Sequence, residues 1–154
     1  MGNILFVCSG NTCRSPMAAA LAGRRLAGSG IRAVSRGLDA VDGGPASPGA
    51  LTVMAEMGLS LAAHRSRLLL PGDLRQASLV LTMTGGQRGR VTALGTGFRV
   101  FALAAFAGEE GDIPDPYLGD LAVYRQCARE LDRLVNKALE RALGGPDFSL
   151  PGRE

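Results

Sequence analysis

The chain has 154 residues, of which 46% are hydrophobic and 20% are charged, and its formal net charge is +3. This length suits one domain with its own core, and the scattered Lys and Arg residues, without a dense run or interleaved aromatic residues, argue against a nucleic-acid-binding protein. The odd number of cysteines and the lack of a long apolar run or a charged leader predict a cytoplasmic protein with reduced thiols and no membrane span.

The first half of the chain predicts strands and helices in alternation. Residues 4–7 are a continuous apolar run, which indicates a strand buried on both faces. A polar loop over residues 8–15 follows, and then a helix over 17–27 with Pro16 in its first turn. Residues 31–35 alternate in polarity and predict a second strand, which a turn-rich loop connects to a helix over 48–57.

The second half continues the alternation. Its residues predict, in chain order, a short helix over 73–77, a strand over 79–83, a helix over 84–94, a strand over 98–103 and a long helix over 118–143, while 60–70 stay unassigned. The alternation predicts a single α/β domain with a parallel sheet. We place this domain at residues 1–146 and a C-terminal tail at 147–154.

The segment from Cys8 to Ser15 contains the residues that predict the chemistry of the site. It follows the first strand, so it lies at the carboxyl edge of the sheet, where ligands bind. A loop that wraps its N–H groups inward before a helix binds phosphate, and the same dipoles are expected to lower the pKa of Cys8. Arg14 can grip two phosphate oxygens with its planar fork, Ser15 can donate to Cys8, and Gly10 suits the bend.

We therefore predict a cysteine-dependent phosphatase with Cys8 as nucleophile and Arg14 as phosphate clamp. The alternative is that Cys8 is an ordinary buried thiol at the end of a strand. The predicted phosphate-binding loop comprises Ser9, Gly10, Asn11, Thr12, Cys13, Arg14 and Ser15.

A phosphatase also needs a proton donor for its leaving group. His64 is the only histidine and lies far from Cys8 in the chain, so a carboxylate is the better candidate. Asp115 stands between two prolines after the fourth predicted strand and should reach the same edge of the sheet; the alternative is a plain turn residue. No Cys/His spacing fits zinc, and we predict neither a metal nor a cofactor.

With these residues, the chain resembles the low-molecular-weight protein tyrosine phosphatase family over nearly its whole length. The resemblance rests on Val7-Cys8-Ser9-Gly10-Asn11-Thr12-Cys13-Arg14-Ser15-Pro16-Met17-Ala18 and on Asp115-Pro116-Tyr117. It implies a three-layer α/β/α domain with a four-stranded parallel sheet, a phosphocysteine intermediate on Cys8, and Asp115 as acid and then base.

The resemblance also implies a supporting network and a redox pair. The network would hold the loop through Asn11, Ser15, Ser35 and His64. Arg36 departs from the family's usual Ser-Ala-Gly around Ser35. Cys13 would form a reversible disulfide with Cys8, with a small core residue as the alternative. Cys127 falls within the long predicted helix and is expected only to pack.

Thr12 and Tyr117 are the predicted specificity residues. The loop is nearly identical to that of the branch resembling bacterial protein-arginine phosphatases, which has Thr where tyrosine-directed members usually have a larger aliphatic residue. Leu118 follows Tyr117, so the expected aromatic pair is reduced and should stack less well on a phenyl ring. The resemblance therefore favours phosphoarginine in proteins as substrate, with phosphotyrosine as the alternative and inorganic phosphate as product.

Two rival functions remain. A thiol-dependent arsenate reductase would need further cysteines around residues 80–95 to relay a disulfide, and the chain has none there. A non-catalytic phosphoprotein-binding module would keep the anion loop but lose the nucleophile or the acid, and both Cys8 and Asp115 are present. The sequence makes no prediction of oligomeric state.

Overall fold

The continuous apolar run near the N-terminus forms the central strand β1 (Asn3–Cys8), which is buried along almost its whole length. In this computed structural model, which describes residues 2–144, β1 pairs with β2 (Arg32–Gly37) on one side and β3 (Ala77–Thr82) on the other. β4 (Val100–Ala102) pairs with β3, and every pair is parallel, in the order β2-β1-β3-β4. The predicted four-stranded parallel sheet is confirmed.

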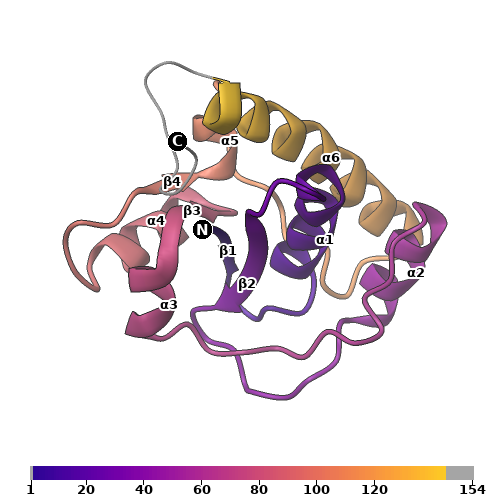
Figure 1. Cartoon of the computed structure of the whole chain (residues 1–154). Helices are drawn as coiled ribbons and strands as arrows, with labels where there is room; N and C mark the ends of the chain where they lie inside the picture. Colours follow the sequence, from indigo (N-terminus) through magenta and orange to yellow (C-terminus); the bar gives the residue numbers. More distant parts are fainter. Residues whose placement is uncertain (1, 145–154) are drawn as a thin grey trace.

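Helices cover both faces of the sheet (Figure 1). Alternate residues of β1 enter two cores: Ile4 and Phe6 pack under one helical layer, and Leu5 and Val7 face the other. The first layer contains α1 (Arg14–Leu26), α2 (Pro48–Glu56), α5 (Leu103–Phe106) and α6 (Leu121–Gly144); the second contains α3 (Pro71–Gln76) and α4 (Gly85–Thr92). The three-layer α/β/α prediction is therefore also confirmed.

The two helices that flank the predicted site begin at other residues than expected. α1 begins at Arg14, so Arg14 itself belongs to the first turn and not to the preceding loop. α6 begins at Leu121 and not at 118, because Leu118 has a left-handed backbone (φ 67°). The Asp120 side chain then caps the helix by accepting a hydrogen bond from the Val123 N–H at 3.0 Å.

The other differences are smaller. The strand predicted over 98–103 is shorter, because its last residue already belongs to α5, which the sequence did not predict. The unassigned residues 60–70 form no long element, but isolated bridges join Leu68 to Gly37 and Arg65 to Pro45. The first of these bridges places the segment beside the end of β2.

The described residues 2–144 contain this one sheet and the helices that cover it, and the predicted domain boundary at 146 and the tail at 147–154 lie outside them. Within residues 2–144, none of the helices combines the length and apolar character needed to span a bilayer. The same part of the chain holds no group of three or more His, Cys, Asp or Glu side chains suited to a metal ion.

Candidate active site

Cys8 is the last residue of β1, and its sulfur lies inside the loop that leads to α1. The thiol is 3% exposed and receives a hydrogen bond from the Asn11 N–H at 3.3 Å. The Ser15 Oγ lies 2.9 Å from Cys8 Sγ. Because α1 begins at Arg14, the free N–H groups of its first turn adjoin the same loop. The strand end, the loop and the helix start thus form one unit with the donors that could bind an anion.

Asn11 is the centre of the hydrogen-bond network behind the loop. It is fully buried in a left-handed conformation (φ 58°) that asparagine tolerates better than most residues. Its Oδ1 accepts from the Arg67 backbone N–H at 2.9 Å, its Nδ2 donates to Ser15 Oγ at 2.8 Å, and its carbonyl accepts from His64 Nε2 at 2.8 Å. The sequence did not indicate Arg67, which contributes only its backbone.

This network also orients the Ser15 hydroxyl. The Ser15 oxygen accepts from the Asn11 amide, so its own hydrogen is free to point at the sulfur of Cys8. The same hydroxyl hydrogen can instead be donated to the Arg36 carbonyl, at a longer distance of 3.5 Å. Ser35 is buried, but no hydrogen bond joins its hydroxyl to the loop within residues 2–144. The backbone of β2 therefore reaches the network through the neighbouring residue.

Gly37 is needed where β2 passes the loop. A Cβ atom there would lie 2.7 Å from the Ser9 carbonyl oxygen and 2.9 Å from the Asn11 Cβ. Two further bonds tie the next residues to the loop, from the Leu38 N–H to the Cys8 carbonyl and from the Asp39 N–H to the Ser9 carbonyl, both at 2.9 Å. The absence of a side chain at Gly37 thus lets the loop rest against β2.

Arg14 joins the loop to the segment that carries Asp115. Its guanidinium is buried, donates to the Ile113 carbonyl at 2.9 Å and lies 3.6 Å from Asp115 Oδ2. The Asp115 side chain is 52% exposed, and its Oδ1 accepts from the Tyr117 N–H at 3.0 Å. The structure therefore brings Cys8, Arg14 and Asp115 to one edge of the sheet.

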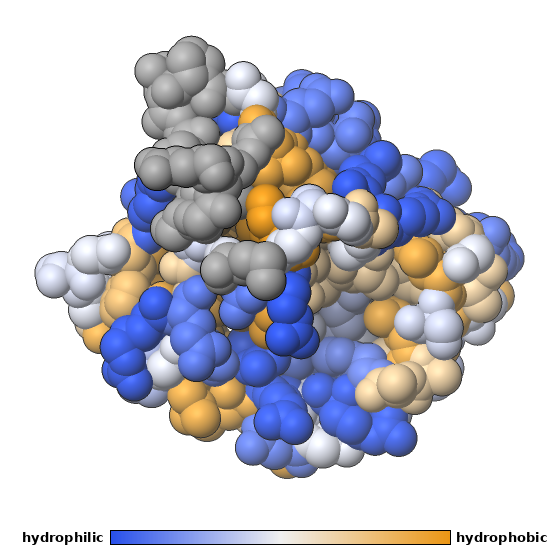
Figure 2. All heavy atoms as spheres, in the orientation of Figure 1, coloured by the Kyte–Doolittle hydropathy of each residue, from blue (hydrophilic) through white to orange (hydrophobic). Residues whose placement is uncertain are grey.

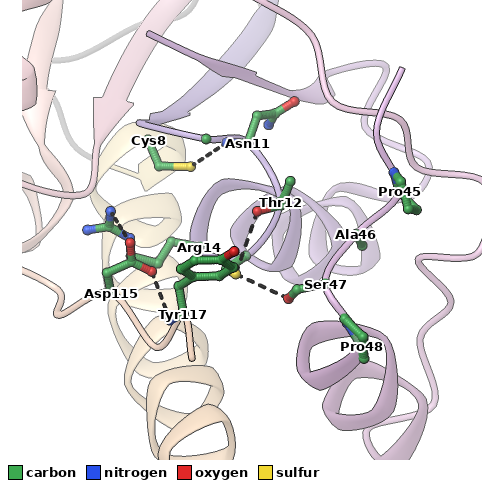
Figure 3. A pocket seen from close by; sticks show the side chains of 12 residues that line it. Cys8, Asn11, Thr12, Arg14, Pro45, Ala46, Ser47, Pro48, Asp115 and Tyr117 are labelled. Carbon is green, nitrogen blue, oxygen red and sulfur yellow. Dashed lines mark hydrogen bonds and ion pairs between the residues drawn. The ribbon is translucent and has the colours of Figure 1, made fainter. Parts of the chain in front are cut away.

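These side chains line a cavity of about 400 Å³ (Figure 3). Asp115 and Tyr117 lie on one side of it, and the segment from Pro45 to Pro48 lies on the other. Thr12 lies between the two walls, on the loop itself. Tyr117 is 62% exposed and is the only aromatic side chain that lines this cavity within residues 2–144.

Burial raises the pKa of Cys8, whereas the hydrogen bonds from Ser15 and Asn11 and the charge of Arg14 act to lower it. The net direction is upward, so the predicted lowering of the Cys8 pKa is wrong for the loop as it stands here. The reason is that the sulfur is almost completely removed from solvent, which disfavours its charged form. Formation of the thiolate therefore depends on the donors around it.

Cys13 makes its contacts away from Cys8. Its sulfur lies 3.1 Å from Ser47 Oγ and 3.4 Å from the Tyr124 hydroxyl, and it is a free thiol in this structure. The Cys8–Cys13 disulfide stays a prediction. Burial and the neighbouring Cys13 raise the pKa of Tyr124 to about 12. Burial likewise raises the pKa of Cys127 to about 12, in agreement with a packing role for that thiol.

Gln87 is a positioning residue that the sequence analysis missed. It is buried at the start of α4, where its Oε1 accepts from the N–H groups of Met83 and Thr84 at 3.0 and 3.1 Å. Its Nε2 donates to Ser9 Oγ at 3.1 Å, which ties α4 to the Cys8 loop. The Thr84-x-x-Gln87 spacing is a capping box and could have marked the helix start, although not the bond to Ser9.

Comparison with known proteins agrees with this geometry. Residues 3–144 match the family model described as low molecular weight phosphotyrosine protein phosphatase. The chain is 40% identical to a protein-arginine-phosphatase of Geobacillus stearothermophilus over 141 residues, which cover 90% of this chain and 94% of the relative. It is also 40% identical to the low molecular weight protein-tyrosine-phosphatase PtpB of Staphylococcus haemolyticus over 138 residues, 87% and 95% of the two chains.

Solved structures give the same result. The crystal structure of a low molecular weight protein tyrosine phosphatase from T. tengcongensis matches with a TM-score of 0.87 at 37% identity, covering 92% of this chain and 99% of the other. The YwlE arginine phosphatase from Geobacillus stearothermophilus matches with a TM-score of 0.84 at 39% identity, covering 92% of each chain.

Proposed function

Because the chain belongs to the low-molecular-weight protein phosphatase family, we propose that it hydrolyses phosphoarginine in proteins through a covalent intermediate on Cys8. That it is a cysteine-based protein phosphatase acting on phosphorylated proteins follows from the family and from the relatives named as phosphatases. The residue roles and the choice of phosphoryl group are the proposal.

In the first step the Cys8 thiolate attacks phosphorus and the bond from phosphorus to the leaving group breaks. Backbone N–H groups of the loop and the Arg14 fork hold the phosphoryl oxygens. Asp115 donates its proton to the departing nitrogen or oxygen. Support for this role comes from its distance of 3.6 Å to Arg14 and from its exposure to the cavity.

In the second step Asp115, now a carboxylate, takes a proton from water as the water oxygen attacks the phosphocysteine. The phosphorus–sulfur bond breaks, inorganic phosphate leaves and Cys8 is restored as a thiolate. The Ser15 hydroxyl at 2.9 Å stabilises the sulfur as it leaves with the electron pair. No metal or cofactor enters either step, since Arg14 and the loop supply the charge.

The preference for phosphoarginine is carried by one observation: Thr12 is the loop side chain between the two walls of the cavity. Its hydroxyl can bond the phosphoramidate nitrogen or position the attacking water, as an aliphatic side chain cannot. Tyr117 as a single, exposed aromatic wall gives a phenyl ring little to stack on. Phosphotyrosine is the second candidate, supported by relatives named protein-tyrosine-phosphatase.

We also propose a cytoplasmic setting, supported by three free thiols.

The test compares kcat/KM on phosphoarginine and phosphotyrosine peptides of one sequence. We expect the wild type to favour phosphoarginine and Thr12→Ile to reduce that preference about ten-fold or more, because a lost hydrogen-bond partner in a site is costly. Thr52→Ile, at an exposed position of α2 outside the cavity, is the matched control and should keep the wild-type ratio. A wild-type enzyme that strongly favours phosphotyrosine would overturn the proposed substrate.

A further inference from the structure

A second cavity, of about 340 Å³, lies along the edge strand β2 and shares no lining residue with the cavity above Cys8. We call it the β2 pocket. Its lining includes six charged or titratable side chains, those of Arg32, Arg36, His64, Arg65, Arg67 and Asp73. Its volume is within the range of about 300–1,000 Å³ that is usual for small-molecule sites. In Figure 2, hydrophilic residues gather on this face in the region between α3 and β2.

The β2 pocket carries an excess of positive charge. Four guanidinium groups line it against the single carboxylate of Asp73. That carboxylate pairs with Arg36 at 3.2 Å and also caps α3, where its Oδ2 accepts from the Leu70 N–H at 2.8 Å. The other three guanidiniums therefore have no carboxylate partner in the pocket.

Of these three guanidinium groups, one bonds backbone carbonyls and the other two have no partner within residues 2–144. Arg65 donates to the carbonyls of Ala62 and His64. The guanidiniums of Arg32 and Arg67 make no hydrogen bond or ion pair to a described residue. Like charges gathered in one concavity repel each other, and the repulsion is relieved when an anion binds between them.

Elsewhere on the surface of the described chain, guanidiniums are often neutralised. Arg90 holds both carboxylate oxygens of Asp39 at 2.8 Å, for example. The β2 pocket thus combines a concave shape with guanidinium forks that are free to bind a ligand. An exposed, solvated charged surface also has free guanidinium groups, but it lacks the concave shape. Forks of this kind suit phosphate groups, which they grip through two parallel bonds.

We propose that the β2 pocket is a second anion site, which binds a small oligophosphate carrying at least two phosphate groups. Three positive charges in excess match the charge of a diphosphate better than that of a single phosphate. No Phe, Tyr or Trp lines the pocket, so it offers no large aromatic ring to stack on a nucleobase. A free oligophosphate is therefore preferred to a nucleotide.

The same pocket adjoins the network that holds the catalytic loop. The Arg67 N–H and His64 Nε2 both bond Asn11, and the Arg36 carbonyl contacts Ser15 Oγ. An anion that draws the side chains of Arg67 and Arg36 together therefore acts on two residues whose backbones are hydrogen-bonded to the catalytic loop.

The experiment is a calorimetric titration of the full chain with methylenediphosphonate, a diphosphate that the enzyme cannot hydrolyse. We expect two binding events, one of which competes with aryl phosphate hydrolysis. In the double variant Arg32→Gln, Arg65→Gln the other event should weaken about ten-fold or more, as expected for lost charge-assisted bonds, while the competitive inhibition constant stays unchanged.

The control is Arg24→Gln, Arg129→Gln, which removes the same charge from exposed positions of α1 and α6. This control variant should show both binding events. A single, competitive event in the wild type would overturn the proposal, and so would equal weakening in both double variants, because that indicates general electrostatics. If the first double variant does not fold, Arg32→Gln alone serves, since Arg32 is exposed on the edge strand.

Discussion

The side chains around Cys8 hold its sulfur and the surrounding loop in place. Asn11 and Ser15 contact the sulfur directly, and His64 and the Arg67 backbone hold Asn11. Each polar group of Asn11 has a specific partner, so the loop has one arrangement instead of several. This fixed arrangement is what an anion site needs, because donors that are already oriented cost no reorganisation during the reaction.

Among single residues, a substitution of Asp115 gives the most direct test of the proposed general-acid role. Asp115→Asn removes the proposed proton donor but keeps the size of the side chain and its hydrogen bond from the Tyr117 N–H. We expect kcat/KM on a phosphopeptide, which reports the step that forms the intermediate, to fall about 10²-fold or more, because general acid catalysis contributes that much. An activated aryl phosphate, whose leaving group needs no proton, should be affected much less.

Steady-state kinetics on the two substrates measures this difference. Asp112→Asn is a suitable control, since Asp112 lies in the same exposed loop but does not line the cavity above Cys8. Equal losses on both substrates in Asp115→Asn would argue against the acid role.

Among the elements, the contact between β2 and the Cys8 loop is the most constrained. Gly37→Ala would place a Cβ atom within 3 Å of Ser9, Asn11 and Ala40. We expect a loss of about 1–3 kcal/mol in the free energy of unfolding, as for other overpacked sites. The loop would also be displaced from Arg14, so kcat should fall even in the fraction that is folded.

Denaturant unfolding and kinetics together check this prediction. Gly23→Ala is the control, because a Cβ atom there meets nothing within 4 Å and alanine favours the interior of α1. That variant should be as stable as the wild type or more so. A Gly37→Ala protein with wild-type stability and kcat would contradict the close approach.

The ion pairs between Glu109, which follows α5, and helix α6 predict a pH dependence of the protein's stability. Glu109, just after α5, pairs with Arg133 and Lys137 of α6, and these partners lower its pKa to about 2 from 4.5. A carboxyl group with a lowered folded-state pKa stabilises the protein fully above the unfolded pKa, and the contribution is lost as pH falls toward the folded value. The window is therefore about pH 4.5 down to 2.

Glu109→Gln should accordingly lower Tm at pH 7, and its difference from the wild type should shrink across that window. Thermal unfolding at several pH values measures it. Glu110→Gln is the neighbouring control, since Glu110 makes no hydrogen bond or ion pair to residues 2–144. A difference that stays constant down to pH 2 would contradict the ion-pair account.

For the whole molecule, the sequence was most informative where the signal is local. The apolar run of β1, the loop from Cys8 and the Asp between two prolines each lie within a few residues, and the strand order then places them at one edge. The resemblance to a known family added the network residues Asn11, Ser15 and His64, which the structure brings together.

The rest depends on contacts between distant residues. Arg67 contributes a backbone N–H across 56 positions, and Gln87 bonds Ser9 across 78, so neither leaves a pattern in the sequence. The direction of the Cys8 pKa depends on how deeply the loop buries the sulfur, which periodicity does not reveal. Likewise, only the fold gathers the arginines of β2 and of the segment before α3 into one pocket.

The central claim is that phosphoryl transfer passes through the sulfur of Cys8. It is tested most directly by quenching a reaction of the Asp115→Asn protein with an activated aryl phosphate, whose leaving group needs no proton, within one turnover and locating the phosphate by mass spectrometry. Loss of the general base should slow hydrolysis of the intermediate and let it accumulate. The account predicts phosphate on Cys8 and none in a Cys8→Ala protein. Turnover by Cys8→Ala, or phosphate on another residue, would contradict it.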